Sequence, residues 1–206
     1  MPTLIGSDTF TDTRLTNLTA HTPSGGGSWA TPVNAWQIGS TPFSTDNVAV
    51  SISNDGTISP AVYTAPVTTP ADQSIQFSLI SASGNHLAGG VVRYTDTSNF
   101  VFAIWNGYSG ELELYSRISG TDTKRDNIAW TPSTQTATVS AIGSTVTFTV
   151  AGASRSLTWA TGGALASGKT GLCATATGEC ATEFDTFNVY DEGSSTVAFR
   201  PYYITG

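Results

Sequence analysis

Charged residues are scarce in this sequence. They make up 11% of the 206 residues, against about a quarter in an average soluble protein. The chain has 8 basic and 15 acidic residues, which gives a net charge of −7, and the basic residues form no cluster. Because nucleic-acid-binding proteins normally carry a basic patch, this composition argues against a nucleic-acid partner.

Long apolar runs are also missing. No run of about 18 apolar residues occurs, so we expect no membrane-spanning helix and no membrane partner. The opening residues MPTLIGSDTF lack the basic segment and apolar core of a secretory leader. We therefore expect no signal peptide.

Cysteine is limited to Cys173 and Cys180, in the segment CATATGEC. The intervening TATG fits the turn of a hairpin, which would place the two thiols opposite each other and allow a disulfide that closes a short loop. Two free, buried thiols fit the sequence equally well. A zinc site is disfavoured, because two cysteines with no histidine nearby do not supply the usual four ligands.

Serine, threonine, glycine and asparagine supply most of the polarity that charge does not. They separate short runs with period-two alternation of apolar residues, and no segment has the pattern of a helix longer than a turn or two. A chain of this length suits one β-rich domain. We predict an all-β, two-sheet antiparallel sandwich over residues 1–190 and a C-terminal arm over residues 191–206.

Residues 89–117 combine more aromatic and charged side chains than any other stretch. Turn-forming residues at 95–99 and 106–110 separate β-branched and aromatic runs, which predicts three antiparallel strands. The following segment, 119–133, is expected to be a loop with a short strand at its end.

Folding the chain at these two turns pairs Tyr94 with Phe100 and Trp105 with Glu111. Alternation along the strands then assigns the side chains to two faces. The predicted core face carries Val92, Tyr94, Phe100, Phe102, Ile104, Leu112, Leu114 and Ile118. The predicted outer face carries Val91, Arg93, Val101, Ala103, Trp105, Glu111, Glu113, Tyr115 and Arg117.

The predicted outer face mixes aromatic rings, carboxylates and guanidinium groups, which suits a polar ligand such as a glycan. The predicted ligand-binding residues are Arg93, Trp105, Glu111, Glu113 and Tyr115. The alternative is an ordinary solvated sheet face with cross-strand ion pairs, since antiparallel sheets commonly leave one face in water.

Three segments of the chain resemble the concanavalin A-like, or laminin G-like, jelly roll. They are DTFTDT…HTPSGGGSW near the start, SGKTGLCA before the penultimate predicted strand, and TEFDTFNVY, with Phe184, Asp185, Phe187 and Val189, at the end. The resemblance spans about residues 7–190. It implies a jelly-roll sandwich in which the first and last strands lie together.

The opening, D-T-F-T-D…H-T-P…G-G…W, resembles the start of jelly-roll proteins of tailed bacteriophages and their hosts. This resemblance implies a non-catalytic virion protein, a decoration or accessory subunit on the capsid, tail or fibre, that sometimes contacts cell-surface glycans. The implied partners are other virion proteins or further copies of this chain, with a trimer as one candidate. Residues of the C-terminal arm would then contact a neighbouring subunit, namely Phe199, Arg200, Tyr202 and Tyr203. The alternative is a secreted carbohydrate-binding module.

The same fold family contains laminarinase-type glycoside hydrolases, whose active strand carries Glu-x-Asp-x-(x)-Glu. The segment ELELY at 111–115 lies in the matching region, but Glu113 replaces the central aspartate, and Tyr115 or Ser116 replaces the final glutamate. The missing acid/base argues against hydrolysis, and we expect no enzyme activity; the further alternative is a divergent laminarinase-like glycoside hydrolase.

Calcium is the ion implied by the resemblance, because many relatives of this fold bind it. Asp8, Asp12, Asp46 and Asp185 are candidate ligands, and Asp185 is the preferred one. Its alternative role is to cap the turn before the last strand. No other cofactor is expected.

Overall fold

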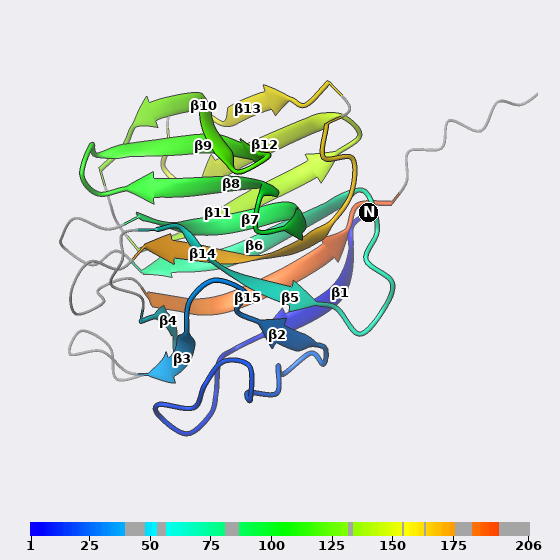
Figure 1. Cartoon of the computed structure of the whole chain (residues 1–206), viewed down its shortest axis with the longest axis vertical. Coiled ribbons are helices and arrows are strands. Elements are labelled where there is room, and N and C mark those ends of the chain that lie inside the picture. Colours follow the sequence, from blue (N-terminus) through cyan, green and yellow to red (C-terminus); the bar gives the residue numbers. More distant parts are fainter. Residues whose placement is uncertain are drawn as a thin grey trace, which may run out of the picture.

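The structure is a computed structural model that describes residues 1–39, 48–52, 57–80, 87–131, 134–153, 155–162, 164–175 and 183–193. The regular secondary structure of these residues is entirely β-strand (Figure 1). Within the same ranges, no helix has the length and apolarity needed to cross a membrane.

The strands form two sheets in which every pairing is antiparallel. The seven-stranded sheet contains, in order across it, β10 (Thr121–Ala129), β9 (Glu111–Ile118), β8 (Asn99–Asn106), β7 (Leu87–Asp96), β14 (Lys169–Thr175), β5 (Ser59–Thr64) and β2 (Ser28–Ala30). The eight-stranded sheet contains β13 (Leu157–Ala160), β12 (Thr145–Val150), β11 (Gln135–Ile142), β6 (Gln73–Ile80), β15 (Glu183–Asp191), β4 (Val48–Ser51) and β3 (Trp36–Gly39), with β1 (Thr3–Asp8) also paired to β15.

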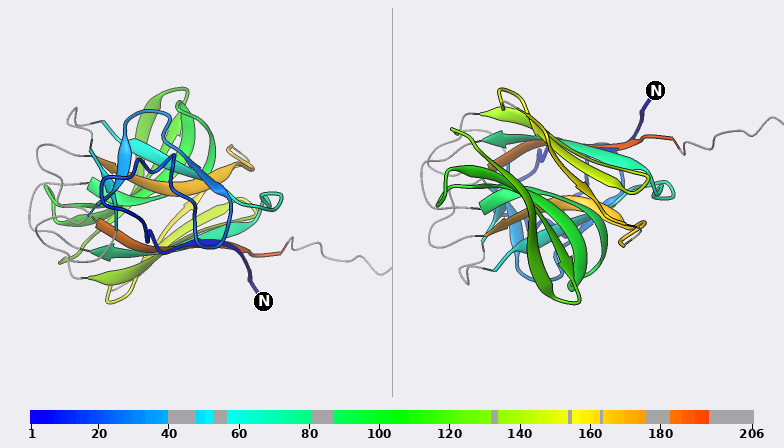
Figure 2. Two further views of the ribbon diagram at one scale, coloured as in Figure 1. Left: turned by 90° about the horizontal axis from the view of Figure 1, so that it is seen from below. Right: turned by 90° about the horizontal axis from the view of Figure 1, so that it is seen from above.

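The two sheets face each other as layers (Figure 2) and enclose the main hydrophobic core. Its large side chains include Trp36, Phe77, Phe148 and Phe184, all almost completely buried. The predicted all-β, two-sheet antiparallel sandwich is therefore confirmed. The expectation that the first and last strands lie together is also confirmed, because β1 pairs with β15 from Thr3 to Asp8.

The three predicted strands of residues 89–117 are present as β7, β8 and β9, but the predicted pairing of β8 with β9 is wrong by one residue. Trp105 pairs with Leu112, and Asn106 pairs with Glu111. Because strand side chains alternate with period two, a slip of one residue moves every side chain of a strand to the opposite face. Phe100, Phe102 and Ile104 therefore lie on the outer face, while Val101, Ala103 and Trp105 belong to the main core.

The predicted loop at 119–133 is largely a strand. Residues 121–129 form β10, which pairs with β9 at the edge of the seven-stranded sheet. Most of its residues are exposed, and charged, polar side chains are what edge strands commonly carry to discourage pairing with other chains. In TDTKRDNIA, polar and apolar residues do not alternate, so the sequence pattern does not indicate a strand.

The predicted C-terminal arm lies mainly outside the described residues. The last strand, β15, ends at Asp191, and the description of the chain ends at residue 193. The arm and its residues Phe199, Arg200, Tyr202 and Tyr203, like the division of the chain at residue 190, remain predictions.

Candidate functional site

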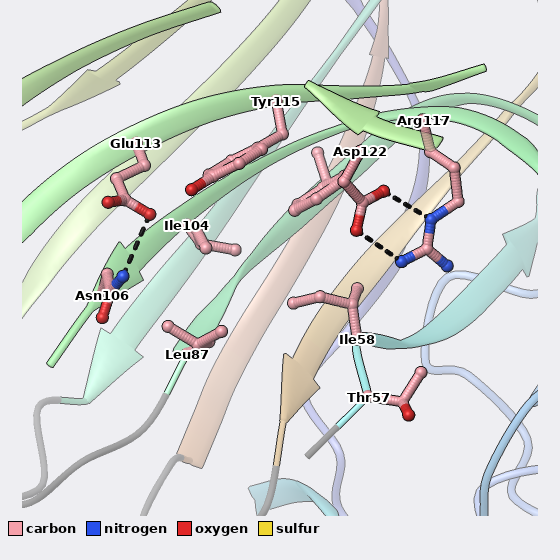
Figure 3. Close-up of a pocket in the computed structure, with 10 residues that line it drawn as sticks. Thr57, Ile58, Leu87, Ile104, Asn106, Glu113, Tyr115, Arg117 and Asp122 are labelled. Carbon is pink, nitrogen blue, oxygen red and sulfur yellow. Dashed lines mark hydrogen bonds and ion pairs between the residues drawn. The ribbon is translucent and has the colours of Figure 1, made fainter. Parts of the chain in front are cut away.

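The outer face of the seven-stranded sheet, which points away from the main core, contains a pocket of about 330 Å³. Its central side chains come from cross-strand pairs of β8 and β9, in which Phe102 lies opposite Tyr115 and Ile104 opposite Glu113. The residues that line it are Thr57, Ile58, Leu87, Phe102, Ile104, Asn106, Glu113, Tyr115, Arg117 and Asp122 (Figure 3). This volume is at the small end of the range found for ligand pockets.

The floor of the pocket is apolar. It belongs to a second hydrophobic cluster on the outer face of the sheet, made of Ile58, Val91, Phe100, Phe102, Ile104 and Cys173. The rings of Phe102 and Tyr115 stack with their centroids 5.0 Å apart and their planes within 4° of parallel. This is a rigid aromatic surface, because each ring is held by its neighbour on the adjacent strand.

Glu113 forms one side of the pocket and is 1% exposed. Its Oε1 accepts a hydrogen bond from Lys124 Nζ at 2.5 Å, and its Oε2 accepts one from Asn106 Nδ2 at 3.1 Å. Burial alone would raise the pKa of Glu113, but the hydrogen bonds from Lys124 and Asn106 outweigh burial and leave that pKa below its ordinary value. Glu113 is therefore a fixed carboxylate that can accept hydrogen bonds at neutral pH.

The turn between β8 and β9 orients Asn106. Its Oδ1 accepts hydrogen bonds from the backbone N–H groups of Tyr108 at 3.0 Å and Ser109 at 3.3 Å, as asparagine commonly does at the start of a turn. With the carbonyl oxygen occupied by the turn, the amide nitrogen points to Glu113 (Figure 3). The side chain can therefore offer its remaining N–H to a ligand in a fixed direction.

Lys124 comes from β10, where it lies opposite Tyr115 on β9. Its ammonium group lies 3.5 Å from Glu111 Oε2 in addition to its contact with Glu113, and 5.8 Å from the centre of the Tyr115 ring. One cation thus joins both carboxylates of the ELELY segment.

At the other end of the pocket, Arg117 and Asp122 form a two-pronged ion pair between β9 and β10. Arg117 Nε lies 2.6 Å from Asp122 Oδ1, and Arg117 Nη2 lies 2.8 Å from Asp122 Oδ2 (Figure 3). The guanidinium group also lies 4.9 Å from the centre of the Phe100 ring. Bidentate arginine–carboxylate pairs are geometrically well defined, so this end of the pocket is fixed as well.

Two of the predicted ligand-binding residues do not lie at the pocket. Trp105 is 3% exposed and belongs to the main core, because the register of β8 turns it inward. Arg93 is completely buried and donates to the backbone carbonyl oxygens of Leu165 and Gly143. The pairing of β7 with β8 is irregular between residues 92 and 96, and Arg93 has a positive φ of 54°. This local bulge redirects its side chain.

The structure brings the other three predicted residues together. Glu113 and Tyr115 line the pocket, and Glu111 is linked to them through Lys124. The residues that sequence reasoning placed elsewhere or left out are Phe102, Ile104, Asn106, Asp122 and Lys124. The alternation in NFVFAIWN would have found the first two if the register had been known.

The predicted disulfide and metal site are not tested by the described residues. Cys173 is buried on β14, and burial raises the pKa of its thiol, while Cys180 lies outside the described residues. Asp185 lies on β15, and Asp46 lies outside the described residues. Among the residues that the structure describes, no group of three His, Cys, Asp or Glu side chains could hold a metal ion. Calcium at Asp185 stays a prediction.

A second group of titratable side chains lies under the long loop that follows β1. His21 Nε2 is 2.9 Å from Asp8 Oδ1, and His21 Nδ1 is 3.0 Å from Asp12 Oδ2. Trp29 Nε1 donates to Asp8 Oδ2 at 2.7 Å, and the backbone N–H of Phe10 donates to Asp8 Oδ1 at 2.8 Å. Burial works to lower the pKa of His21, but its hydrogen bonds to Asp8 and Asp12 outweigh burial and raise that pKa.

Comparison with known proteins found no matching family model and no matching curated protein. The similarity to solved structures is clear. A protein of unknown function with a galectin-like fold from Bacillus subtilis has a TM-score of 0.61 at 12% identity, with 92% of this chain and 98% of that chain covered.

Two further solved structures are named for carbohydrates. Domain 4 of AbnA, an extracellular GH43 arabinanase from Geobacillus stearothermophilus solved in complex with arabinotriose, has a TM-score of 0.56 at 13% identity and covers 92% of this chain and 93% of that one. The carbohydrate-binding module CBM66 from Bacillus subtilis has a TM-score of 0.52 at 12% identity and covers 79% of this chain and 91% of that one. At these identities the likeness shows the fold alone. The chain therefore has a galectin-like jelly-roll sandwich, a fold that it shares with carbohydrate-binding modules.

Proposed function

We propose that this protein is a non-catalytic carbohydrate-binding domain that holds a saccharide in the pocket of the seven-stranded sheet. The observation that carries the proposal is an apolar aromatic floor, formed around Phe102 and Tyr115, between two fixed polar ends at Glu113 and Arg117. A sugar ring presents an apolar C–H surface and hydroxyl groups at its rim. It can pack on the floor while its hydroxyls exchange hydrogen bonds with the polar ends.

The solved structures of similar fold support this proposal. One is a domain of an arabinanase in complex with arabinotriose, and another is a carbohydrate-binding module. The site itself is argued from the side chains of this chain, because the fold is compatible with many functions.

The state of the carboxylates supports a binding rather than a hydrolytic role. Retaining and inverting hydrolysis both need one carboxylic acid that can donate a proton and one carboxylate. Glu113 has a lowered pKa, which makes it a poor proton donor at neutral pH. Glu111 contacts the same ammonium group of Lys124.

Calorimetric titration of the purified chain tests the proposal. The probes are arabinotriose and oligosaccharides of fructose, galactose and β-linked glucose. We expect at least one of them to bind, and we expect Tyr115→Ala to weaken its binding by about tenfold, or 1.4 kcal/mol. The matched control is Tyr190→Ala, since Tyr190 is a partly exposed tyrosine on β15 of the other sheet.

The result that would contradict the proposal is binding that Tyr115→Ala leaves unchanged, or no binding to any probe. Release of reducing sugar from the polymers of the same four sugars would contradict the non-catalytic part alone.

For the biological setting we propose a virion protein of a tailed phage, with the saccharide site directed at host or environmental glycans. The resemblance of the opening sequence supports this setting. Mass spectrometry of particles purified on a density gradient should detect the chain in fixed proportion to the major capsid protein. Its presence only in the fraction without particles would favour a secreted carbohydrate-binding module instead.

A further inference from the structure

We propose that the pocket takes neutral saccharides and discriminates against those that carry carboxylate or sulfate groups. The inference rests on the proposed function, since it names the class of saccharide that the same pocket would bind. It follows from how the charges around the pocket are paired.

Each cation that the described chain places at the pocket already has a carboxylate partner. Lys124 contacts Glu113 at 2.5 Å and Glu111 at 3.5 Å. Arg117 is held by Asp122 through two contacts of 2.6 and 2.8 Å. An anionic sugar would have to displace one of these carboxylates to gain an ionic partner, and each is positioned by the strands themselves.

Half of the six lysines and arginines away from the pocket are held by other contacts. The chain has only eight lysines and arginines, and three of those outside the pocket are occupied by other contacts. Arg93 donates to backbone carbonyl groups in the interior. Arg125 lies 4.5 Å from the Trp159 ring and donates to Ser116, whose side chain is on the opposite face of β9 from Tyr115. Arg155 is paired with Asp126.

The segments of sequence outside the described residues contain one of the eight lysines and arginines, Arg200 in the C-terminal segment. Residues 53–56, 81–86 and 176–182 contain no lysine or arginine, and the only basic group among them is His86. Among the residues that the structure describes, the cations at the pocket are Lys124 and Arg117, and both are paired with carboxylates.

The balance of charge at the pocket is negative. Three carboxylates, from Glu111, Glu113 and Asp122, are set against the two cations of Lys124 and Arg117, and the whole chain carries −7. An anionic saccharide would lose hydration on entry without gaining an unpaired cation, and it would approach a surface of its own sign. A neutral saccharide meets neither cost, and the same carboxylates accept hydrogen bonds from its hydroxyls.

The test compares one polymer in two charge states. The neutral polysaccharide that binds most tightly in a panel of fructan, galactan and β-1,3-glucan, whose chains keep free primary hydroxyls, is oxidised at those hydroxyls to carboxylates, and both forms are titrated into the full chain at low and at physiological salt. Two known acidic polymers, polygalacturonate and dextran sulfate, are included. We expect the oxidised form to bind at least tenfold more weakly, with the difference narrowing as salt increases.

Two variants with the same change in net charge separate the pocket from the rest of the surface. Asp122→Asn removes the partner of Arg117 inside the pocket, and should reduce the discrimination against the oxidised polymer by several-fold. Asp126→Asn removes a carboxylate of the same strand that is paired with Arg155 outside the pocket, and should leave the discrimination unchanged.

The outcomes distinguish this inference from the proposed function. Binding of the oxidised or acidic polymers as tight as that of the neutral polymer would overturn the inference and leave saccharide binding intact. Discrimination that neither salt nor Asp122→Asn alters would also overturn it, because the cause would then be shape. If no polymer binds, the proposed function itself fails, and the inference fails with it.

Discussion

Asp8 and Glu113 are two buried carboxylates that lie in different surroundings. Each residue is 1% exposed, and each carboxylate accepts hydrogen bonds from one basic side chain and from at least one neutral N–H donor. Asp8 is bound by His21, by the indole of Trp29 and by the backbone of Phe10. Glu113 is bound by Lys124 and Asn106.

The difference lies in what is next to the carboxylate. Around Asp8 the donors are themselves covered, since His21 and Trp29 are 5% and 4% exposed, and the ring of Trp29 packs 4.9 Å from Phe187 and 5.1 Å from Tyr63. Glu113 instead lines an open pocket. Burial and ion pairing therefore do not mark a functional group by themselves. The two carboxylates are equally covered, and they differ in that a pocket lies beside Glu113.

The largest loss of stability is expected when the Asp8 carboxylate is removed. Asp8→Ala should lower the free energy of unfolding by about 3–5 kcal/mol at pH 6, because it leaves a buried imidazolium without its partner and a buried indole N–H without an acceptor. Denaturant unfolding followed by tryptophan fluorescence measures this loss. In the fraction that remains folded, saccharide affinity should equal that of the unchanged chain.

The matched control is Asp12→Asn, which changes the other carboxylate bound to His21, a side chain that is 32% exposed. This substitution should lower the free energy of unfolding much less than Asp8→Ala does. Equal losses for the two variants would show that burial of Asp8 does not set the size of the effect.

Removing the charge of Glu113, at the pocket, is expected to weaken saccharide binding and to change stability little. Glu113→Gln keeps the size of the side chain and its hydrogen bond with Asn106, but it removes the negative charge opposite Lys124. Saccharide affinity should fall about tenfold, since a charged acceptor becomes a neutral one, while the free energy of unfolding should change by about 1 kcal/mol. Titration calorimetry and denaturant unfolding on the same preparation measure the two quantities. A large loss of stability with unchanged affinity would make Glu113 a structural residue like Asp8.

The side of the site contributed by β9 could be predicted from the sequence. In ELELYSRI, apolar and polar residues alternate, so Leu112 and Leu114 must face the core, and Glu113 and Tyr115 must face outward. The structure has this arrangement. The alternation suffices because a slip would bury charge.

The side contributed by β8 could not be predicted, because NFVFAIWN is apolar on both faces. Its register depends on the length of the turn, and the turn begins after Asn106 rather than at it. Two consequences follow from this single difference. Trp105 becomes a core residue, and Phe102 becomes the floor of the pocket.

Contacts between distant parts of the chain could not be predicted from the sequence either. Nothing in the local pattern joins His21 to Asp8 across 13 residues. Lys124 comes from an edge strand whose polar sequence is typical of a loop. Arg93 required a bulge with positive φ, which non-glycine residues adopt only rarely.

The smallest effect expected concerns pH, and it should act on stability alone. The pKa of His21 is raised above its ordinary value of 6.5 because its hydrogen bonds to Asp8 and Asp12 outweigh burial. A group whose pKa is higher in the folded than in the unfolded chain stabilises the fold fully below the unfolded pKa, and this contribution is lost as pH rises through the folded pKa. The pKa of Asp12 is lowered from 3.8 by its hydrogen bond to His21, so its contribution is lost as pH falls below that value. The free energy of unfolding should therefore be highest between pH 3.8 and 6.5 as far as this cluster is concerned, and decline above pH 6.5.

Denaturant unfolding from pH 5 to 9 should show this decline in the unchanged chain and a flatter profile in His21→Gln. Saccharide affinity should stay constant over the same range, because Glu113 remains ionised throughout. A decline that persists unaltered in His21→Gln would assign the pH dependence to another group and would remove the argument that the cluster around Asp8 is a charged one.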